Sequence, residues 1–398
     1  MSAGNQMPFE LNSSDARKLL AHFEGRRSEV LSLVRALCEA ESPSGDAEGS
    51  RAVVNLLSDA ARTLRSVASV ERINAPNNYG EHLLLRTFAE GASDEARSLL
   101  LLGHTDTVHP RGTLAERPWR ETEGRIHAPG IFDMKASCAV ALEALRACEA
   151  VGLRPRRPVT LLLTCDEESG SFSGRELVEA ESRRSECVLV LEPPAPGGRA
   201  KTARKGTGLF NLSVEGRAAH AGLEPEKGTS AVHEIARQIE RVSALAKPEV
   251  GTTINVGTVG GGTHANVVAA EAHAEIDVRF STADEAWRIE SALRGLKPFD
   301  ERARLSVSGG INRPPLERTK AVAELFEKAR RVASAFDFEL GEASVGGASD
   351  GNFAAAVGAT VLDGLGVEGD GAHASHEHIF ADRLALRGAL LAALVATL

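Results

Sequence analysis

Three apolar stretches in the first half of the chain each end in a residue that can bind a metal ion. SLLLLG (98–103) runs into His104, VTLLLTC (159–165) into Asp166-Glu167-Glu168, and CVLVL (187–191) into Glu192. Side chains just past the carboxyl ends of parallel strands meet in one crevice of an open α/β sheet. If these stretches are neighbouring strands, an imidazole and several carboxylates lie together.

The order of the remaining elements predicts what surrounds this crevice. Strand-like stretches at 82–87, 99–103, 159–164 and 187–191 alternate with helical stretches at 14–40, 46–63, 134–150 and 174–181. Such alternation is typical of an α/β domain with a doubly wound, mostly parallel sheet.

A different pattern begins near residue 205. The order becomes strand, helix, two strands, helix, strand, over 209–214, 229–245, 252–259, 272–280, 283–293 and 304–308. This order matches the split βαβ, ferredoxin-like unit. Helices at 320–336 and from 381 resume the first pattern. Because 398 residues are too many for one ordinary core, we predict a catalytic domain in two parts, 1–204 and 312–398, interrupted by an inserted α+β domain at 205–311.

Charge and composition argue against several classes of partner. With 46 basic and 55 acidic residues the net charge is −9, which gives no electrostatic footprint for nucleic acid or an anionic membrane. No apolar run approaches the ~18 residues of a membrane span, and residues 1–20 lack a secretory pattern. We expect a cytoplasmic protein whose five cysteines, which form no CxxC pair, are buried thiols.

Two motifs place single acids near the crevice. In GHTDTV, Asp106 stands two residues after His104 and could orient its ring as a metal ligand; a strand-end histidine and a turn aspartate are the alternative. In PGIFDMKAS, Asp133 stands at a predicted helix start. It could be an N-cap, or it could bridge two cations ~3.5–4 Å apart.

The acidic triplet in CDEESG is harder to explain without a cation. Consecutive acids repel one another and raise one another's pKa, and divalent cations would remove that cost. One glutamate could bind metal while the other serves as general acid and base; a solvated acidic turn is the alternative. GAHASHEHI adds His373, His376 and His378 around Glu377. The resulting nitrogen and oxygen donors suit zinc and tolerate cobalt or manganese.

These motifs occur in a recognisable order. HTDTV, PGIFDMK, DEESG, LEP, RAAHAG, SDGNF and GAHASHEHI follow one another along the chain. Their series resembles the M20 family of metallopeptidases, in particular its glutamate carboxypeptidase and carboxypeptidase G2-like branch. The resemblance extends from about Glu29 to the C-terminus, and the predicted insertion falls where that family has its lid and dimerisation domain.

The resemblance implies two zinc ions per subunit, with cobalt or manganese possible. One ion would be held by His104, Asp133 and Glu192 and the other by Asp133, Glu168 and His373, so that Asp133 bridges them. Glu167 matches the family's general base, and Asp106 the acid that orients His104. His373 is preferred over His376 because it precedes Glu377 by four residues, as the family's ligand usually precedes a glutamate; His376 remains the alternative.

The resemblance also assigns residues of the insertion to the substrate. His220 in RAAHAG matches a lid histidine that in several relatives reaches the neighbouring subunit's active site. Asn266 and Arg279 resemble positions that hold the substrate's carboxylate, which an arginine can bind through two parallel hydrogen bonds. Lys205 and Arg313 are further candidates. A surface turn histidine and an arginine paired with a neighbouring acid are the alternatives for His220 and Arg279.

We therefore expect a dinuclear zinc hydrolase that cleaves an amide or peptide bond next to a free carboxylate. A glutamate carboxypeptidase-like exopeptidase, forming a homodimer through its lid, is the first expectation. An N-acyl-amino-acid deacylase and a di- or tripeptidase are alternatives, so the substrate is a small peptide or an N-acyl amino acid. A catalytically silent relative that binds a small molecule is a further alternative, against which the general base Glu167 argues.

Overall fold

The computed structural model describes residues 11–91 and 96–398, which leaves the first ten residues of the polar N-terminal lead-in outside the described part. The chain divides into two compact units. The first comprises Met1–Thr202, Arg318–Ser344 and Ser349–Leu398, and the second comprises Ala203–Glu317 and Val345–Ala348. The second unit thus contains the residues predicted as an insertion, 205–311, and extends past them to Glu317 and to a short later segment.

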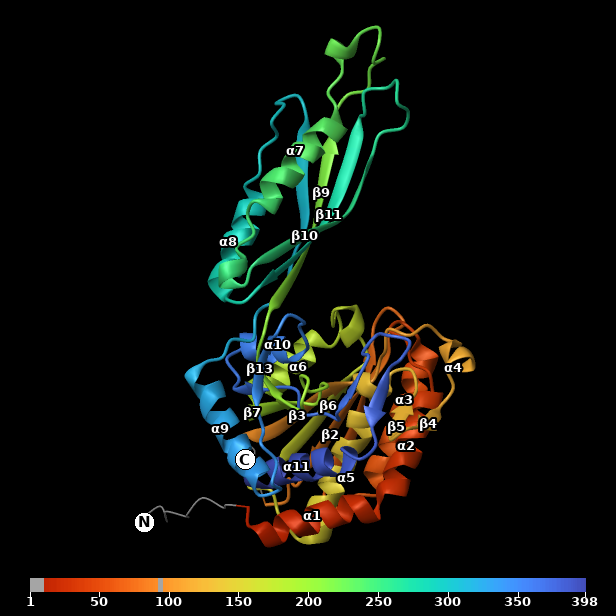
Figure 1. Cartoon of the computed structure of the whole chain (residues 1–398), viewed down its shortest axis with the longest axis vertical. Coiled ribbons are helices and arrows are strands. Elements are labelled where there is room, and N and C mark those ends of the chain that lie inside the picture. The colour runs from red at the N-terminus through yellow and green to blue at the C-terminus, as the bar shows by residue number, and fades with distance from the viewer. Residues whose placement is uncertain (1–10, 92–95) are drawn as a thin grey trace. The chain divides into compact units, whose positions relative to one another are not determined.

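A mixed sheet forms the centre of the first unit, with helices on both of its sides (Figure 1). Its strand order is β1-β2-β6-β3-β7-β14. The strands are β1 Val67–Ala75, β2 Gly80–Thr87, β3 Ser98–His104, β6 Val159–Thr164, β7 Ser185–Val190 and β14 Val361–Leu362. Strand β3 pairs in parallel with β6 and β7, and β7 with β14, whereas the β1–β2 hairpin is antiparallel to β6. The carboxyl ends of β3, β6 and β7 therefore meet at one edge, as predicted.

Two details of this unit differ from the sequence prediction. The helical stretch 14–40 is two helices, because Gly25, a poor helix former, ends the first and Arg26 leaves helical geometry. Strand β1 was not predicted, since it is half exposed and carries few large apolar side chains. The helices are α1 Ser13–Gly25, α2 Arg27–Glu39, α3 Ala47–Arg62, α4 Thr113–Glu116, α5 Ala136–Val151, α6 Arg175–Arg183, α9 Lys320–Ser334, α10 Gly351–Ala356 and α11 Leu384–Thr397.

Helix α11 is buried on nearly all sides and packs on α1 and α5. Its one charged side chain, Arg387, is 1% exposed and donates to the carbonyls of Gly366 (2.8 Å), Gly198 (3.0 Å) and Gly364 (2.8 Å). Burial lowers the pKa of this guanidinium to about 10. Arg387 thereby joins loops that are distant in sequence and satisfies buried carbonyl groups.

A second, smaller sheet brings the end of the chain beside the segment that precedes Asp133. Its antiparallel order is β15-β16-β5-β4, and β16 pairs with β5. The strands are β4 Arg120–Thr122, β5 Arg125–His127, β15 Gly369–Asp370 and β16 His378–Phe380. The loop with the late histidines therefore starts and ends in this sheet.

The second unit is a ferredoxin-like antiparallel sheet with strand order β10-β11-β9-β12. Its elements are β9 Gly206–Glu215, α7 Ala231–Ser243, β10 Thr253–Gly261, β11 Glu271–Phe280, α8 Ala283–Arg294 and β12 Arg304–Arg313. Residues of β9 and β11 alternate between buried and more exposed, so one face of the sheet packs against α7 and α8. Strands β8 (Ala200–Arg204) and β13 (Glu342–Val345) cross the boundaries of the units. Within the described ranges, no helix is both long and apolar enough to cross a membrane.

Candidate metal centre

His104 lies at the carboxyl end of β3 and is 1% exposed. Its Nε2 faces Asp133 Oδ1 at 3.2 Å and Glu192 Oε1 at 3.4 Å. Its Nδ1 lies 3.0 Å from the main-chain oxygen of Asp106. A proton on Nδ1, donated to that carbonyl, leaves Nε2 as the atom that can bind a metal. Burial opposes the charged ring, but the three surrounding acids raise the pKa of His104 well above its usual value.

Asp106 supports two parts of the centre with different atoms. Its carbonyl holds the His104 ring, whereas its carboxylate accepts the backbone amides of Glu167 and Glu168, both at 3.1 Å. The same carboxylate accepts the Ser44 hydroxyl at 2.5 Å. Burial raises the pKa of Asp106, but the hydrogen bond and charge of His104, together with the hydrogen bonds from Ser44 and the Glu168 amide, outweigh burial and lower the pKa. Ser44 lies between the two helices predicted at 14–40 and 46–63, and nothing in the sequence pointed to its contact with Asp106.

Asp133 points one carboxylate oxygen at each of two histidines. Oδ1 lies 3.2 Å from His104 Nε2, and Oδ2 lies 3.4 Å from His373 Nε2. The N-cap alternative is wrong, because α5 begins at Ala136 with Lys135 in the N-cap position. Burial opposes ionisation, but the two histidines hold the pKa of Asp133 far below its usual value.

The acidic triplet divides into one residue that holds the loop and two that face the centre. Asp166 Oδ2 accepts the amide (2.6 Å) and hydroxyl (2.8 Å) of Ser173 and so fixes the turn after β6. Glu168 Oε1 lies 3.1 Å from His373 Nε2. Burial, with Asp133 nearby, raises the pKa of Glu168 against the opposing effect of His373. Asp166 and Glu167 are 0% and 8% exposed, so the alternative of a solvated acidic turn is wrong.

The candidate donor atoms fall into two overlapping groups, each with its atoms within 4.8 Å of one another. The first is His104, Glu167 and Glu192, and the second is His104, Asp133 and Glu168. Both glutamates of the triplet therefore reach the donor set.

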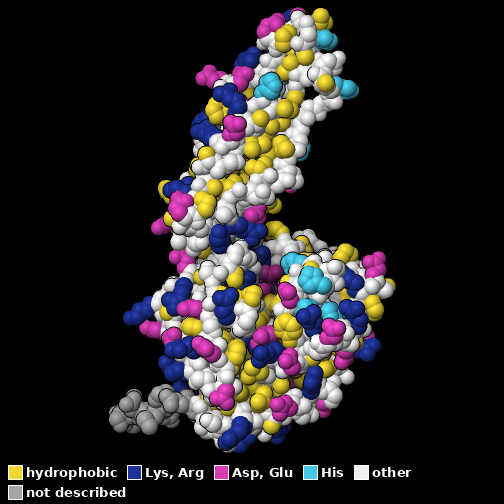
Figure 2. Space-filling model, in the orientation of Figure 1, with side chains coloured by type: hydrophobic (Ala, Val, Ile, Leu, Met, Phe, Trp, Pro, Cys, Tyr) yellow, Lys and Arg dark blue, Asp and Glu magenta, His cyan; other side chains and the backbone are white. Residues whose placement is uncertain are grey.

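His373 closes the centre from the far end of the sequence. Its backbone is left-handed (φ 64°) and its side chain is 52% exposed. Hydrogen bonds with Asp133 and Glu168 raise the pKa of its imidazole to about 10. His378 instead places Nδ1 2.9 Å from the carbonyl of His376, and its ring packs 5.0 Å from that of His127. Figure 2 shows histidine side chains gathered on one part of the first unit's surface, beside acidic ones.

The remaining predicted site residues lie in the second unit. Exposed His220 and Asn266 are brought close through the main chain, because the Ala221 amide donates to the Asn266 carbonyl at 3.0 Å. Arg279 on β11 and Arg313 on β12 both stand opposite Thr207 of β9, so they lie on either side of one strand.

Arg279 and Lys205 both contact other groups of the second unit. Arg279 forms two hydrogen bonds with Asp277, at 2.8 and 2.9 Å, which is the pairing considered as its alternative role. The amide of Lys205 donates to the carbonyl of Val345 at 3.0 Å.

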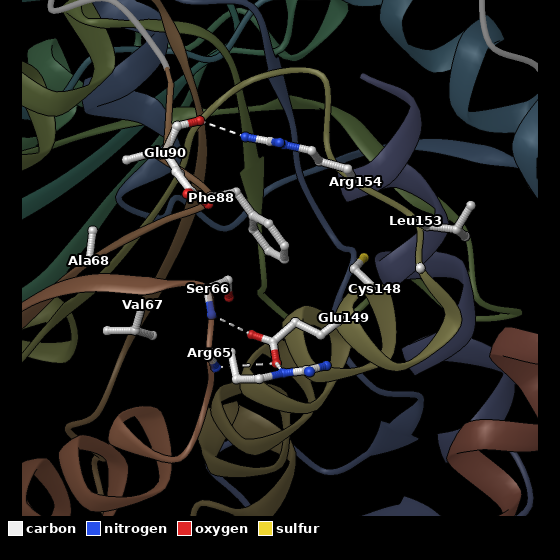
Figure 3. Close-up of a pocket in the computed structure, with 12 residues that line it drawn as sticks. Arg65, Ser66, Val67, Ala68, Phe88, Glu90, Cys148, Glu149, Leu153 and Arg154 are labelled. Carbon is white, nitrogen blue, oxygen red and sulfur yellow. Dashed lines mark hydrogen bonds and ion pairs between the residues drawn. The ribbon is translucent and has the colours of Figure 1, made fainter.

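A cavity of about 690 Å³ beside β1 and α5 provides a contrast with the centre. Figure 3 shows its polar groups paired with one another: Glu149 accepts the amides of Arg65 and Ser66, and Arg154 donates to the carbonyl of Glu90. Burial raises the pKa of the Cys148 thiol to about 12, so it stays protonated at neutral pH. Among the described residues that line the cavity there is thus neither an activated nucleophile nor a set of metal ligands.

Comparison with known proteins shows the family of this chain. A family model described as peptidase family M20/M25/M40 matches residues 100–397. The chain belongs to this family. It is therefore a hydrolase of peptide or amide bonds, from a family of metal-dependent enzymes, and the expected family and enzyme class are confirmed.

Two curated relatives and one solved structure illustrate the range of the family. Carboxypeptidase G2 of Pseudomonas sp. is 28% identical over 354 residues, covering 86% of this chain and 83% of the relative. Succinyl-diaminopimelate desuccinylase of Alkalilimnicola ehrlichii is 32% identical over 300 residues, 70% and 77% of the two chains. Aminopeptidase PepT of Bacillus cereus shares the fold, with a TM-score of 0.75 at 22% identity over 93% and 98%. The predicted fold class is confirmed.

Proposed function

We propose that the protein is a dinuclear zinc exopeptidase that cleaves an amide or peptide bond next to a free carboxylate, as a glutamate carboxypeptidase does. The observation that carries this proposal is the position of Asp133, whose two oxygens each face a histidine nitrogen, at 3.2 and 3.4 Å. A carboxylate so placed can be shared by two cations.

The donor set fits the group that the family implies. In the proposal, His104, Asp133 and Glu192 would hold one ion, while Asp133, Glu168 and His373 would hold the other. Two imidazoles and three carboxylates suit zinc, with cobalt or manganese as possible replacements. The acids that raise the pKa of His104 are Asp106, which is not a proposed ligand, and Asp133 and Glu192, which are; those that raise the pKa of His373, Asp133 and Glu168, are both proposed ligands.

The chemistry then depends on the residues around the ions. When bound, a pair of divalent cations supplies Lewis acidity and lowers the pKa of water. In the proposal, Glu167 takes the proton of the attacking water and returns it to the leaving amine. Asp106 keeps Glu167 in place through its backbone amide (3.1 Å) and also fixes the His104 ring. A hydrogen-bond donor aimed at the developing oxyanion, a role that we assign to His220, would stabilise the transition state.

Recognition of the substrate is assigned to the second unit. We propose that Arg279, Asn266, Arg313 and Lys205 bind the carboxylate end of a small peptide or N-acyl amino acid. The arginines on either side of Thr207 support this assignment, since two guanidinium groups near each other can bind one carboxylate. The pairing of Arg279 with Asp277 means that substrate would compete with that acid.

The same residues would serve an N-acyl-amino-acid deacylase. The similarity to a desuccinylase, at 32% identity, favours this second candidate, and a di- or tripeptidase remains a third. We also propose a homodimer formed through the second unit. Figure 2 shows a band of hydrophobic side chains along that unit, and a large exposed apolar patch is typical of an interaction surface. Sedimentation velocity at several concentrations tests the dimer.

A substrate panel tests the proposed activity. The purified protein, loaded with zinc, is assayed on N-acyl amino acids with glutamate, leucine, lysine or ornithine at the carboxyl end, on dipeptides with a free amine, and on the carboxyl-terminal amides of each. The proposal predicts hydrolysis of blocked substrates with a free carboxylate, and glutamate as the best end residue. Cleavage of the amides at equal rates, or of free dipeptides alone, would contradict the carboxypeptidase and the deacylase alike.

A further inference from the structure

A hydrogen-bonded group outside the ligand set joins the segment of Asp133 to the segment of His373. Its members are Glu377 and His109, which are 3% and 6% exposed, and Arg117, which is half buried. We refer to these three side chains as the Glu377 clamp. Within the described part of the chain, these side chains form hydrogen bonds with one another and with main-chain groups rather than with a candidate donor atom.

The carboxylate of Glu377 is fully used as an acceptor. Oε1 accepts the amides of Phe132 (2.9 Å) and Asp133 (3.0 Å). Oε2 accepts the amide of Gly130 (2.8 Å) and lies 2.6 Å from Nε2 of His109. An ionised carboxylate offers two oxygens and no donor, so it matches this set of four donors, whereas a glutamine could satisfy the partners of one oxygen only.

The protonation of His109 follows from its two neighbours. Arg117 Nη2 lies 3.2 Å from His109 Nδ1. Because a guanidinium can only donate, Nδ1 must accept, and the ring's proton is on Nε2, where it is donated to Glu377. The ring is therefore a neutral bridge between a cation and an anion.

Arg117 closes the connection on the side of His373. Its Nη1 donates to the carbonyl of Ala374 at 3.1 Å. Ala374 directly follows His373, and Glu377 directly precedes β16. The clamp thus contacts the chain just before and at Asp133, and the chain just after His373. Those two residues supply the oxygen and nitrogen atoms that face each other at 3.4 Å.

We propose that the Glu377 clamp positions Asp133 and His373 relative to each other before metal binds. Arg117, His109 and Glu377 are positioning residues in this proposal, because they act through the backbone of Asp133 and of residues beside the proposed ligands. His373 has a left-handed backbone and a highly exposed side chain. Its position therefore depends more on contacts of the residues next to it in the chain than that of the buried ligands does. The inference rests on the proposed metal centre, but its test includes a measurement on metal-free protein.

The test uses two variants and a matched control in the full-length chain. Glu377→Gln removes one acceptor oxygen, and Arg117→Met removes the two donor contacts at a half-buried position that tolerates a change of side chain. The control is Glu143→Gln in α5. Glu143 is also buried, at 7% exposed, and also bonds a histidine, His22, at 2.7 Å, but it lies outside the donor set.

Two readouts are measured. Amide hydrogen exchange of Gly130, Phe132 and Asp133 in chelator-treated protein reports the Asp133 segment, and competition with a chromophoric chelator reports affinity for Co²⁺ and Zn²⁺. We expect faster exchange at these amides in Glu377→Gln and also in Arg117→Met, although Arg117 bonds none of them. Metal affinity should fall on the order of 10- to 100-fold in Glu377→Gln, while Glu143→Gln leaves exchange and affinity at the wild-type level.

The outcomes separate this inference from the proposed function. If exchange at the three amides in Arg117→Met equals that in the wild type and the control, the clamp does not couple the two segments and the inference is wrong. If Glu377→Gln lowers metal affinity no more than Glu143→Gln does, it is also wrong. A wild-type chain that binds neither ion refutes the proposed metal centre, and the exchange of metal-free protein still decides whether the clamp exists.

Discussion

Adjacent Glu167 and Glu168 are assigned different roles, general base and metal ligand. Replacing each of them with glutamine tests this assignment. Both changes preserve size and remove one charge. Both backbone amides are held by the same carboxylate of Asp106, at 3.1 Å. The local fold is therefore supported equally in the two variants, and a difference between them reports the side chains.

The expected magnitudes follow from the contacts. Loss of a general base costs about 10²- to 10⁴-fold in kcat, or roughly 3–5 kcal/mol of transition-state stabilisation, so Glu167→Gln should retain two ions per chain and lose turnover by that factor. Glu168 lies 3.1 Å from His373. Glu168→Gln should therefore lose affinity for one ion, by at least about 10-fold.

Metal-free protein gives an independent readout of the same division. Hydrogen bonds with Asp133 and Glu168 raise the pKa of His373 to about 10. Glu168→Gln removes one of these charges, so the pKa measured by NMR should fall, whereas Glu167→Gln should leave it near the wild-type value. Activity is followed with the best substrate of the panel, and metal content by elemental analysis. The reasoning is refuted if Glu167→Gln loses an ion while Glu168→Gln keeps both, since the roles are then exchanged.

Three further predictions concern the protons released when metal binds and the stability that Asp106 and Arg387 give to the fold. Because the pKa values of His104 and His373 are raised in the metal-free protein, a metal ion must displace their protons to bind. Zinc affinity should therefore rise with pH from 6 to 8, and calorimetry in buffers of different ionisation enthalpy should detect about one proton released per histidine. A zinc affinity that is independent of pH would contradict this. Asp106→Asn replaces a buried, charged acceptor with a neutral amide and should lower the free energy of unfolding, measured in urea, by about 1–3 kcal/mol. An unchanged urea midpoint would show that the backbone amides of Glu167 and Glu168 do not need a charged acceptor. Arg387→Met leaves three buried carbonyls without their hydrogen-bond donor and should lower the free energy of unfolding by at least about 3 kcal/mol. A decrease below about 1 kcal/mol would mean that water replaces the guanidinium.

The sequence predicted most of the architecture because apolar periodicity reports burial directly. The four-leucine stretch before His104 and the VTLLLT stretch became central strands with every residue buried. Strand β1 was not predicted because an edge strand needs no continuous apolar face. The break after Gly25 was missed because the helices on both of its sides bury residues in the same core.

From the sequence, candidate site residues could be proposed only where the side chain is itself of a type that binds metal or transfers protons. His104, Asp133, Glu168, Glu192 and His373 stood out as donors at the ends of apolar stretches or in a recognisable motif. Their supports did not, because a hydrogen bond from Ser44 or Arg117 to a distant segment depends on three-dimensional contacts that leave no local pattern. The triplet itself was ambiguous for the same reason: its sequence does not show that Asp166 turns toward Ser173.

The central claim is that Asp133 bridges two metal ions, and anomalous diffraction from crystals of the zinc-loaded protein tests it most directly. The account predicts two peaks near full occupancy, one within bonding distance of each Asp133 oxygen, with His104 and Glu192 at the first ion and Glu168 and His373 at the second. A single peak, or two peaks of which one has no contact with Asp133, would contradict it.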